Sequence, residues 1–240
     1  MPSRTAVMTR MNRLFTAASL AVVLVSVERF SFTTEVFLEP ARFLRLHELV
    51  QMTVIIPITA AVLALMLHEV SRRFRALSLG PFLLFVVGAY FYATGNGVHE
   101  LGSFTLQTHC DFDEPTGDLC AGLFINDFYT GNTMFFAGAL LMNLAVLVVE
   151  RRNPAEPMGR GALAVLVVNA LVFALAVLAY AAFDRVVVGL VFAVVMAVVA
   201  LGFLVPVRGR YRRFPFTTYT ALTYVVGTIA SLLVRLLSVV

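Results

Sequence analysis

The chain has 240 residues, of which 60% are hydrophobic and only 13% are charged, and its mean hydropathy is +0.90. A soluble domain is about half apolar and about one-quarter charged, and one of this size cannot hide so many apolar side chains from water. This composition excludes an ordinary soluble globular protein and predicts a multi-pass protein of the cell membrane, in contact with the lipid bilayer. The net charge of +4 comes without the basic stripe of a nucleic-acid-binding protein, so no nucleic-acid partner is expected.

Seven apolar runs are long enough to cross the hydrocarbon layer of a membrane, which needs roughly 20 helical residues. Each run is expected to be helical, because lipid offers no hydrogen-bond partner to an open backbone. The expected transmembrane helices cover residues 12–29, 48–70, 81–102, 127–150, 162–183, 186–207 and 216–240. An interfacial segment at 30–46 is expected to follow the first helix. The chain is therefore predicted to be a single all-α transmembrane domain.

Arginines gather in four short segments that are spaced one helical hairpin apart, and the chain contains no lysine. Thirteen of the 18 arginines lie within positions 4–13, 72–75, 151–160 and 208–213. Positively charged loops of membrane proteins stay on the cytoplasmic side. We therefore expect the N-terminus and these segments in the cytoplasm. Seven crossings then place the C-terminus outside.

Two cysteines, Cys110 and Cys120, flank an acidic stretch at 111–119 between the third and fourth helices. The expected topology puts this loop outside, where disulfides persist. The spacing does not suit a metal pair, in which typically about two to four residues separate the cysteines. We therefore expect a disulfide that closes the outer loop.

Polar residues share one face near the outer end of the third helix. Asn96, His99 and Glu100 are spaced i, i+3 and i+4, which places them side by side on a helix. Tyr92 continues the same face one turn earlier. Other polar groups are expected near the same membrane face. They are His47, Glu48 and Gln51 on the second helix, His109 after the third, Asp127 and Asn132 on the fourth, and Arg235 on the last.

These residue types favour a membrane-embedded enzyme with an outward-facing His/carboxylate site, acting on a lipid or isoprenoid-like substrate. In a metal-dependent version, His47, His99 and His109 would supply three imidazole ligands to zinc or iron and leave a fourth position for water. None of the three His-Glu dipeptides continues into the H-E-x-x-H zinc motif. A haem held by His47 and His99 is a further alternative.

In a metal-free version, Glu100 and Asp127 act as acid and base, with Glu48 as a third candidate carboxylate. We expect His99 and Glu100 to face the bundle interior and to meet His47 or Glu48 and Asp127. Arg235 is expected to pair with the carboxylate of Glu100, Asp127 or Glu48, or otherwise to extend to the lipid head groups. The residues expected to contact the substrate are Asn96, Gln51, Tyr92, Asn132 and Arg235.

A non-catalytic function is the alternative from a different class. The protein could be a carrier for a small solute, coupled to protons, or an accessory subunit of a membrane complex. Carriers place ionisable groups near the middle of the bilayer, whereas here the charges lie toward one face, which favours the enzyme. Taken singly, each of these polar residues can also be a solvated group at the membrane interface.

Overall fold

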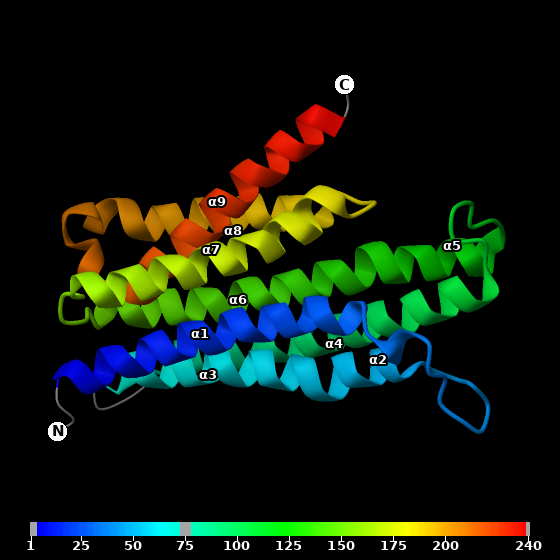
Figure 1. The fold of residues 1–240 in the computed structure, drawn as a ribbon, viewed down its shortest axis with the longest axis horizontal. Helices are drawn as coiled ribbons and strands as arrows, with labels where there is room; N and C mark the ends of the chain where they lie inside the picture. The colour runs from blue at the N-terminus through cyan, green and yellow to red at the C-terminus, as the bar shows by residue number, and fades with distance from the viewer. Residues whose placement is uncertain (1–3, 73–77, 239–240) are drawn as a thin grey trace.

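The computed structural model describes residues 4–72 and 78–238. All the long elements in this part of the chain are helices (Figure 1). Seven helical segments of the described residues are long and apolar enough to cross a membrane. Arg73, Arg75 and the last two residues of the expected seventh helix, 239–240, lie outside the described residues.

Four of the seven segments are single helices, and three are built from consecutive helical elements, of which η4 contains a kink at Arg210. In chain order the elements are α1 (Arg4–Arg29), a short turn η1 (Phe32–Thr34), α2 (Leu46–Val50) with the π-helical turn η2 (Gln51–Ile55) and α3 (Ile56–Ser71), α4 (Leu79–His109), α5 (Gly117–Ile125) with the π-helical turn η3 (Asn126–Gly131) and α6 (Asn132–Arg152), α7 (Arg160–Phe183), α8 (Val188–Leu204) with η4 (Val205–Arg213), and α9 (Pro215–Ser238).

Two helices are longer than expected at the same end of the bundle. Helix α4 continues to His109, and the segment that contains α6 begins already at Gly117. Hydropathy does not mark the extension of α4, because the stretch 103–109 is less apolar than a membrane span. The predicted disulfide is confirmed: Cys110 and Cys120 are bonded between the two extensions.

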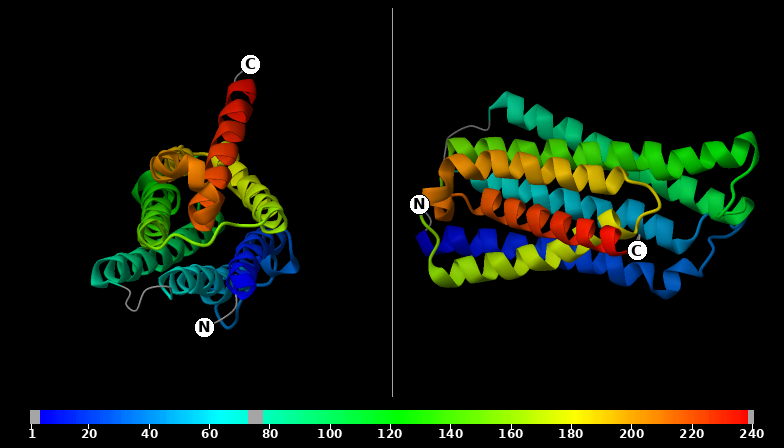
Figure 2. Two further views of the ribbon diagram at one scale, coloured as in Figure 1. Left: turned by 90° about the vertical axis from the view of Figure 1, so that its left-hand side faces the viewer. Right: turned by 90° about the horizontal axis from the view of Figure 1, so that it is seen from above.

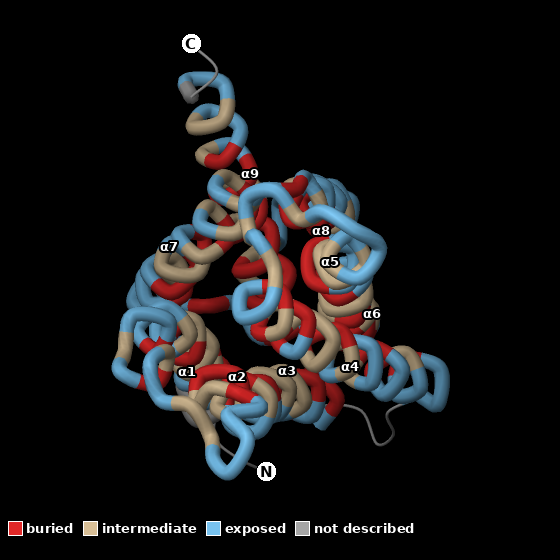
Figure 3. The backbone as a smooth tube through the Cα atoms, turned by 90° about the vertical axis from the view of Figure 1, so that its right-hand side faces the viewer, coloured by how far each residue is buried: buried red, intermediate tan, exposed pale blue. Residues whose placement is uncertain are grey.

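The bundle has two chemically different ends (Figures 1 and 2). One carries the start of α1, the ends of α3 and α6, and the arginine-rich η4, and we call it the arginine end. The opposite end carries the disulfide, the end of α4 and α5, and we call it the disulfide end. Seen from the disulfide end, the buried residues lie mainly on the inward sides of the helices (Figure 3).

Glycines let α4 and α6 approach at backbone distance. A Cβ atom added at Gly95 would lie 2.2 Å from the backbone nitrogen of Phe135, and one at Gly138 would lie 2.2 Å from that of Tyr92. Small residues have this role at helix–helix contacts in membranes, where close packing replaces the hydrophobic driving force. The participating glycines repeat every seven residues: Gly88, Gly95 and Gly102 lie on α4, and Gly131 at the end of η3 is followed by Gly138 on α6.

The half of the bundle nearest the arginine end is filled by apolar side chains, including the fully buried Phe15, Met66 and Leu147. At this end the buried carboxylate of Glu150 caps the start of α9. It accepts hydrogen bonds from the backbone N–H of Phe216 and of Thr217, each at 2.7 Å, and from the Thr217 hydroxyl at 2.6 Å. A carboxylate satisfies the free N–H groups at a helix N-terminus and suits its positive dipole.

Candidate functional site

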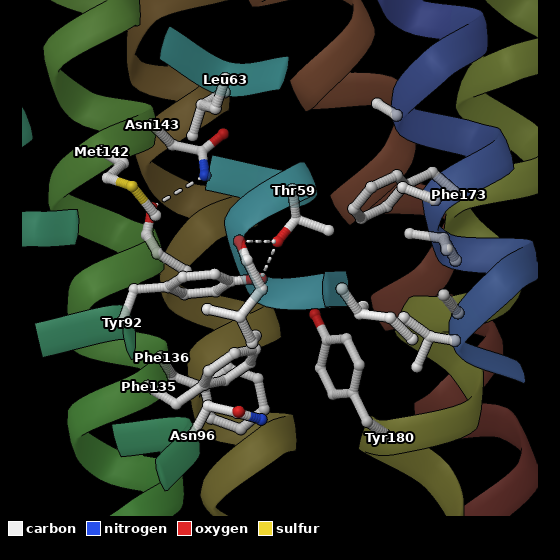
Figure 4. A pocket seen from close by; sticks show the side chains of 18 of the residues that line it. Thr59, Leu63, Tyr92, Asn96, Phe135, Phe136, Met142, Asn143, Phe173 and Tyr180 are labelled. Carbon is white, nitrogen blue, oxygen red and sulfur yellow. Dashed lines mark hydrogen bonds between the residues drawn. The ribbon is translucent and has the colours of Figure 1, made fainter. Parts of the chain in front are cut away.

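A cavity of about 400 Å³ lies inside the bundle, on the disulfide side of the apolar core. Its walls are mainly apolar and aromatic, and Figure 4 shows Phe135, Phe136 and Tyr180 around it. This volume falls within the range of small-molecule sites in proteins. One end of the cavity is polar, and the residues that line it there are Arg29, Gln51, Asn96, His99, Glu100 and Asn132.

A histidine–aspartate pair stands at the polar end. His99 Nδ1 lies 2.6 Å from Asp127 Oδ1 and 3.2 Å from the Asp127 backbone oxygen. The Asp127 side chain is only 2% exposed, whereas that of His99 keeps 21% and lines the cavity. Because Asp127 occupies Nδ1, the ring nitrogen left for a ligand is Nε2. A carboxylate on one imidazole nitrogen sets the tautomer and the ring orientation for proton transfer at the other.

The local fold brings this pair together. Asp127 lies in the π-helical turn η3, and such turns often occur at functional sites. A Cβ at Gly131 would lie 2.7 Å from the backbone nitrogen of His99, and one at Gly102 would lie 3.1 Å from that of Asp127. The glycine contacts between α4 and α6 therefore set the distance between the imidazole and the carboxylate.

A second chain of polar groups reaches the cavity from α1 and α2. His47 Nδ1 lies 2.6 Å from Glu28 Oε2, and the Gln51 amide donates to the same oxygen at 2.7 Å. The other nitrogen of His47, Nε2, lies 3.9 Å from Glu100 Oε2. Asn96 donates to Glu100 Oε1 at 3.2 Å. All five side chains are buried, so the bundle holds two carboxylates and one imidazole in one polar chain.

Glu28 is absent from the residues expected from the sequence, because Glu28-Arg29 marks the polar end of the first apolar run. In the structure it is 6% exposed and is the closest carboxylate to His47. Its position could have identified it, since an acid at the end of one helix lies level with a histidine at the start of the next antiparallel helix.

Two further expected residues line the cavity. The hydroxyls of Tyr92 and Thr59 are hydrogen-bonded at 2.9 Å, and the Tyr92 ring stacks on Phe135 with centroids 4.4 Å apart (Figure 4). Asn132 donates to the backbone oxygen of Phe128 at 3.1 Å. The structure thus brings together His47, Gln51, Tyr92, Asn96, His99, Glu100, Asp127 and Asn132.

Glu48 and His109 do not join them. Glu48 is fully buried, but it pairs with Arg45 and also accepts from the Arg45 backbone N–H at 3.1 Å, which caps α2. His109 is exposed at the end of α4, ten residues beyond His99 and so roughly 15 Å further along the axis. Since one helix carries both imidazoles at that separation, the expected three-histidine metal site is wrong.

No other grouping replaces that metal site: among the described residues, no three His, Cys, Asp or Glu side chains are placed to hold a metal ion. His47 faces Glu28 and Glu100, whereas His99 faces Asp127. The two imidazoles expected to bind a haem are therefore already directed at separate carboxylates.

The expectation that Arg235 pairs with a site carboxylate is also wrong. Its Nε donates to the backbone oxygen of Ala181 at 2.8 Å, and its Nη2 donates to that of Asp184 at 3.0 Å. The last carbonyls of a helix lack partners within the helix and attract a cation. Arg235 therefore ties the last turns of α9 to the end of α7.

Comparison with protein families, with characterised proteins and with solved structures gives no match to this chain.

Proposed function

We propose that the protein is a membrane-embedded enzyme that performs acid–base chemistry on a lipid-like molecule held in the cavity. The observation that supports this most is the 2.6 Å contact between His99 and Asp127 at the polar end of an otherwise apolar cavity of about 400 Å³. An apolar chamber suits a lipid tail, and a histidine oriented by a carboxylate suits proton transfer at its head.

His99 is the proposed general base. It accepts a proton at Nε2 from a bound water molecule or from the substrate, while Asp127 stabilises the imidazolium that forms. Glu100, held by Asn96 and close to His47, is the second group that exchanges a proton with the substrate. A positioned acid or base of this kind typically contributes about 10²- to 10⁴-fold to the rate.

The proposed orientation puts the arginine end in the cytoplasm and the site near the outer face of the cell membrane. Arginine-rich segments favour the cytoplasmic side, and a disulfide persists in an oxidising compartment. On α4, Glu100 lies 21 residues after Leu79, roughly 32 Å along the axis, which is close to the thickness of the hydrocarbon layer. The polar groups therefore lie at the level of the lipid head groups.

The substrate is proposed to reach the cavity sideways, between α1 and α7. In the described part of the chain, the side-chain hydrogen bonds between these helices all lie toward the arginine end. Asn12 donates to the Ala162 oxygen, Ser19 donates to the Asn169 oxygen, and Asn169 donates to the Thr16 hydroxyl. Toward the disulfide end both helices line the cavity instead of binding one another.

A proton-coupled carrier or an accessory subunit is the alternative. A carrier must open its site to each side of the membrane in turn. Here the floor of the cavity is formed by Met66 and Phe216, which belong to the packed apolar cluster toward the arginine end. The polar groups also gather at one end, and both features favour the enzyme.

The test is a lipid-consumption assay. The purified protein is incubated with a total lipid extract of the membrane that contains it, and each lipid species is followed by mass spectrometry. We expect one lipid class to be converted, with the rate falling at least about 100-fold in His99→Ala. His109→Ala, which removes an exposed imidazole from the same helix, should keep the full rate. Unchanged lipids, or full activity in His99→Ala, would refute the proposal.

A further inference from the structure

The polar end of the cavity presents hydrogen-bond acceptors. Three amide side chains that line it each use their NH₂ group on a protein oxygen: Gln51 on Glu28 at 2.7 Å, Asn96 on Glu100 at 3.2 Å, and Asn132 on a backbone oxygen at 3.1 Å. These bonds determine which way each amide points. Each of these bonds uses one N–H of the amide and leaves its oxygen free to accept from a ligand.

Asn96 is the clearest example. Its side chain is 6% exposed, and its Oδ1 is buried without a hydrogen-bond partner among the described residues. A buried acceptor without a partner costs free energy, so it marks a place where a donor binds. Figure 4 shows the Asn96 amide on the cavity wall.

Glu100, one helical turn further on the same face, is the least compensated carboxylate of the site. Glu28 and Asp127 each have an imidazole nitrogen at 2.6 Å, whereas the closest imidazole nitrogen to Glu100, His47 Nε2, lies at 3.9 Å. The side chain is nevertheless 95% buried and lines the cavity. A buried carboxylate without a close cation favours a positively charged ligand.

We propose that the head group bound at Glu100 and Asn96 is the primary ammonium of a single-chain lipid. This names the substrate class of the cavity and therefore rests on the proposed function. An ammonium has three donors and no acceptor, which matches the Glu100 carboxylate and the amide oxygens at the polar end of the cavity. A carboxylate or phosphate head would meet the Glu100 carboxylate at close range, whereas the cation Arg29, which also lines the cavity, is exposed to solvent.

The rest of the cavity suits one long apolar tail. Gln51 and Met66 both line it and lie 15 residues apart on one continuous helical segment, which is roughly 22 Å along the axis. The walls between them are aliphatic and aromatic, with Phe136 and Phe173 among them. A volume of about 400 Å³ lies toward the lower end of the range for ligand sites, which fits one chain and not the two chains of a bilayer phospholipid.

Photo-crosslinking tests this inference by binding alone, without turnover. The full-length protein in lipid nanodiscs is labelled with a 16-carbon primary amine that carries a diazirine in mid-chain, and the labelled peptides are identified by mass spectrometry. Unlabelled hexadecylamine, hexadecan-1-ol and palmitic acid are then added as competitors. We expect labelling of the cavity walls on α6 and α7. Hexadecylamine should compete at a concentration at least tenfold below that of the alcohol, and palmitic acid should compete least.

A charge variant gives the second measurement. Glu100→Gln keeps the size of the side chain and should weaken amine labelling at least tenfold. The matched control is Glu35→Gln, which removes an exposed carboxylate outside the cavity and should label like the wild type. Labelling confined to the outer surface of the bundle, equal competition by palmitic acid, or unchanged labelling of Glu100→Gln would each overturn the ammonium assignment. His99→Ala should still bind the amine, so a failure of the proposed catalysis is recognised separately.

Discussion

Replacing Gly95 with alanine tests the contact that holds the two halves of the site together. The added Cβ would lie 2.2 Å from the backbone nitrogen of Phe135 and 2.7 Å from the backbone oxygen of Gly131. An ordinary contact begins at 3.4 Å, so the backbones must separate by about 1.2 Å, because neither obstructing atom can rotate away. Overpacking of this kind costs about 1–3 kcal/mol of stability.

Gly97→Ala is the matched control, because it adds the same methyl group two residues away, where nothing lies within 4 Å. This variant should gain up to about 1 kcal/mol in the free energy of unfolding, because alanine has a higher helix propensity than glycine. The stabilities of the two variants should therefore differ by about 1–4 kcal/mol. At the scale of about 2–4 °C per kcal/mol for chains of this size, the difference in Tm is roughly 2–16 °C.

The measurement is the thermal unfolding midpoint of each variant in one detergent at one heating rate. Gly95→Ala should also lose activity beyond its loss of stability, because separating α4 from α6 lengthens the 2.6 Å contact between His99 and Asp127. If Gly95→Ala melts at or above the temperature of Gly97→Ala, the backbones of α4 and α6 do not approach closely at Gly95, and the reasoning is refuted.

Three further predictions concern topology and stability. A single cysteine introduced as Asp113→Cys should react with a membrane-impermeant maleimide added to whole cells, whereas Glu156→Cys should react only after permeabilisation; the reverse pattern would contradict the proposed orientation. Replacing Cys110 and Cys120 together by serine should lower the free energy of unfolding by about 3 kcal/mol, since the short loop they close is then free in the unfolded chain. An unfolding midpoint equal to that of the oxidised wild type would show that the bond does not stabilise the fold, and wild-type protein treated with reductant should melt like the variant. Glu150→Ala should lower the free energy of unfolding by about 3 kcal/mol, because it leaves the buried start of α9 without its acceptor. Glu150→Gln keeps one acceptor oxygen and should lower the free energy of unfolding by less. Equal losses in the two variants would mean that the capping geometry does not matter.

Much of the fold follows from the sequence because it depends on local composition. Seven apolar runs specify seven helices, since the backbone of such a run has no other way to satisfy its hydrogen bonds in lipid. Two cysteines in one turn-rich loop specify the disulfide. The spacing of Asn96, His99 and Glu100 places them on one face of α4, independently of which neighbouring helix that face contacts.

Tertiary structure alone decided what each polar side chain meets. Hydropathy does not say how far a helix is rotated about its axis or at what level it packs against its neighbour, and the glycine contacts of α4 and α6 determine both here. That packing gives His99 the carboxylate of Asp127. The fold of α1 against α2 gives His47 the unexpected Glu28. Arg235 meets carbonyl oxygens instead of a carboxylate, because the tilt of α9 carries it to the end of α7.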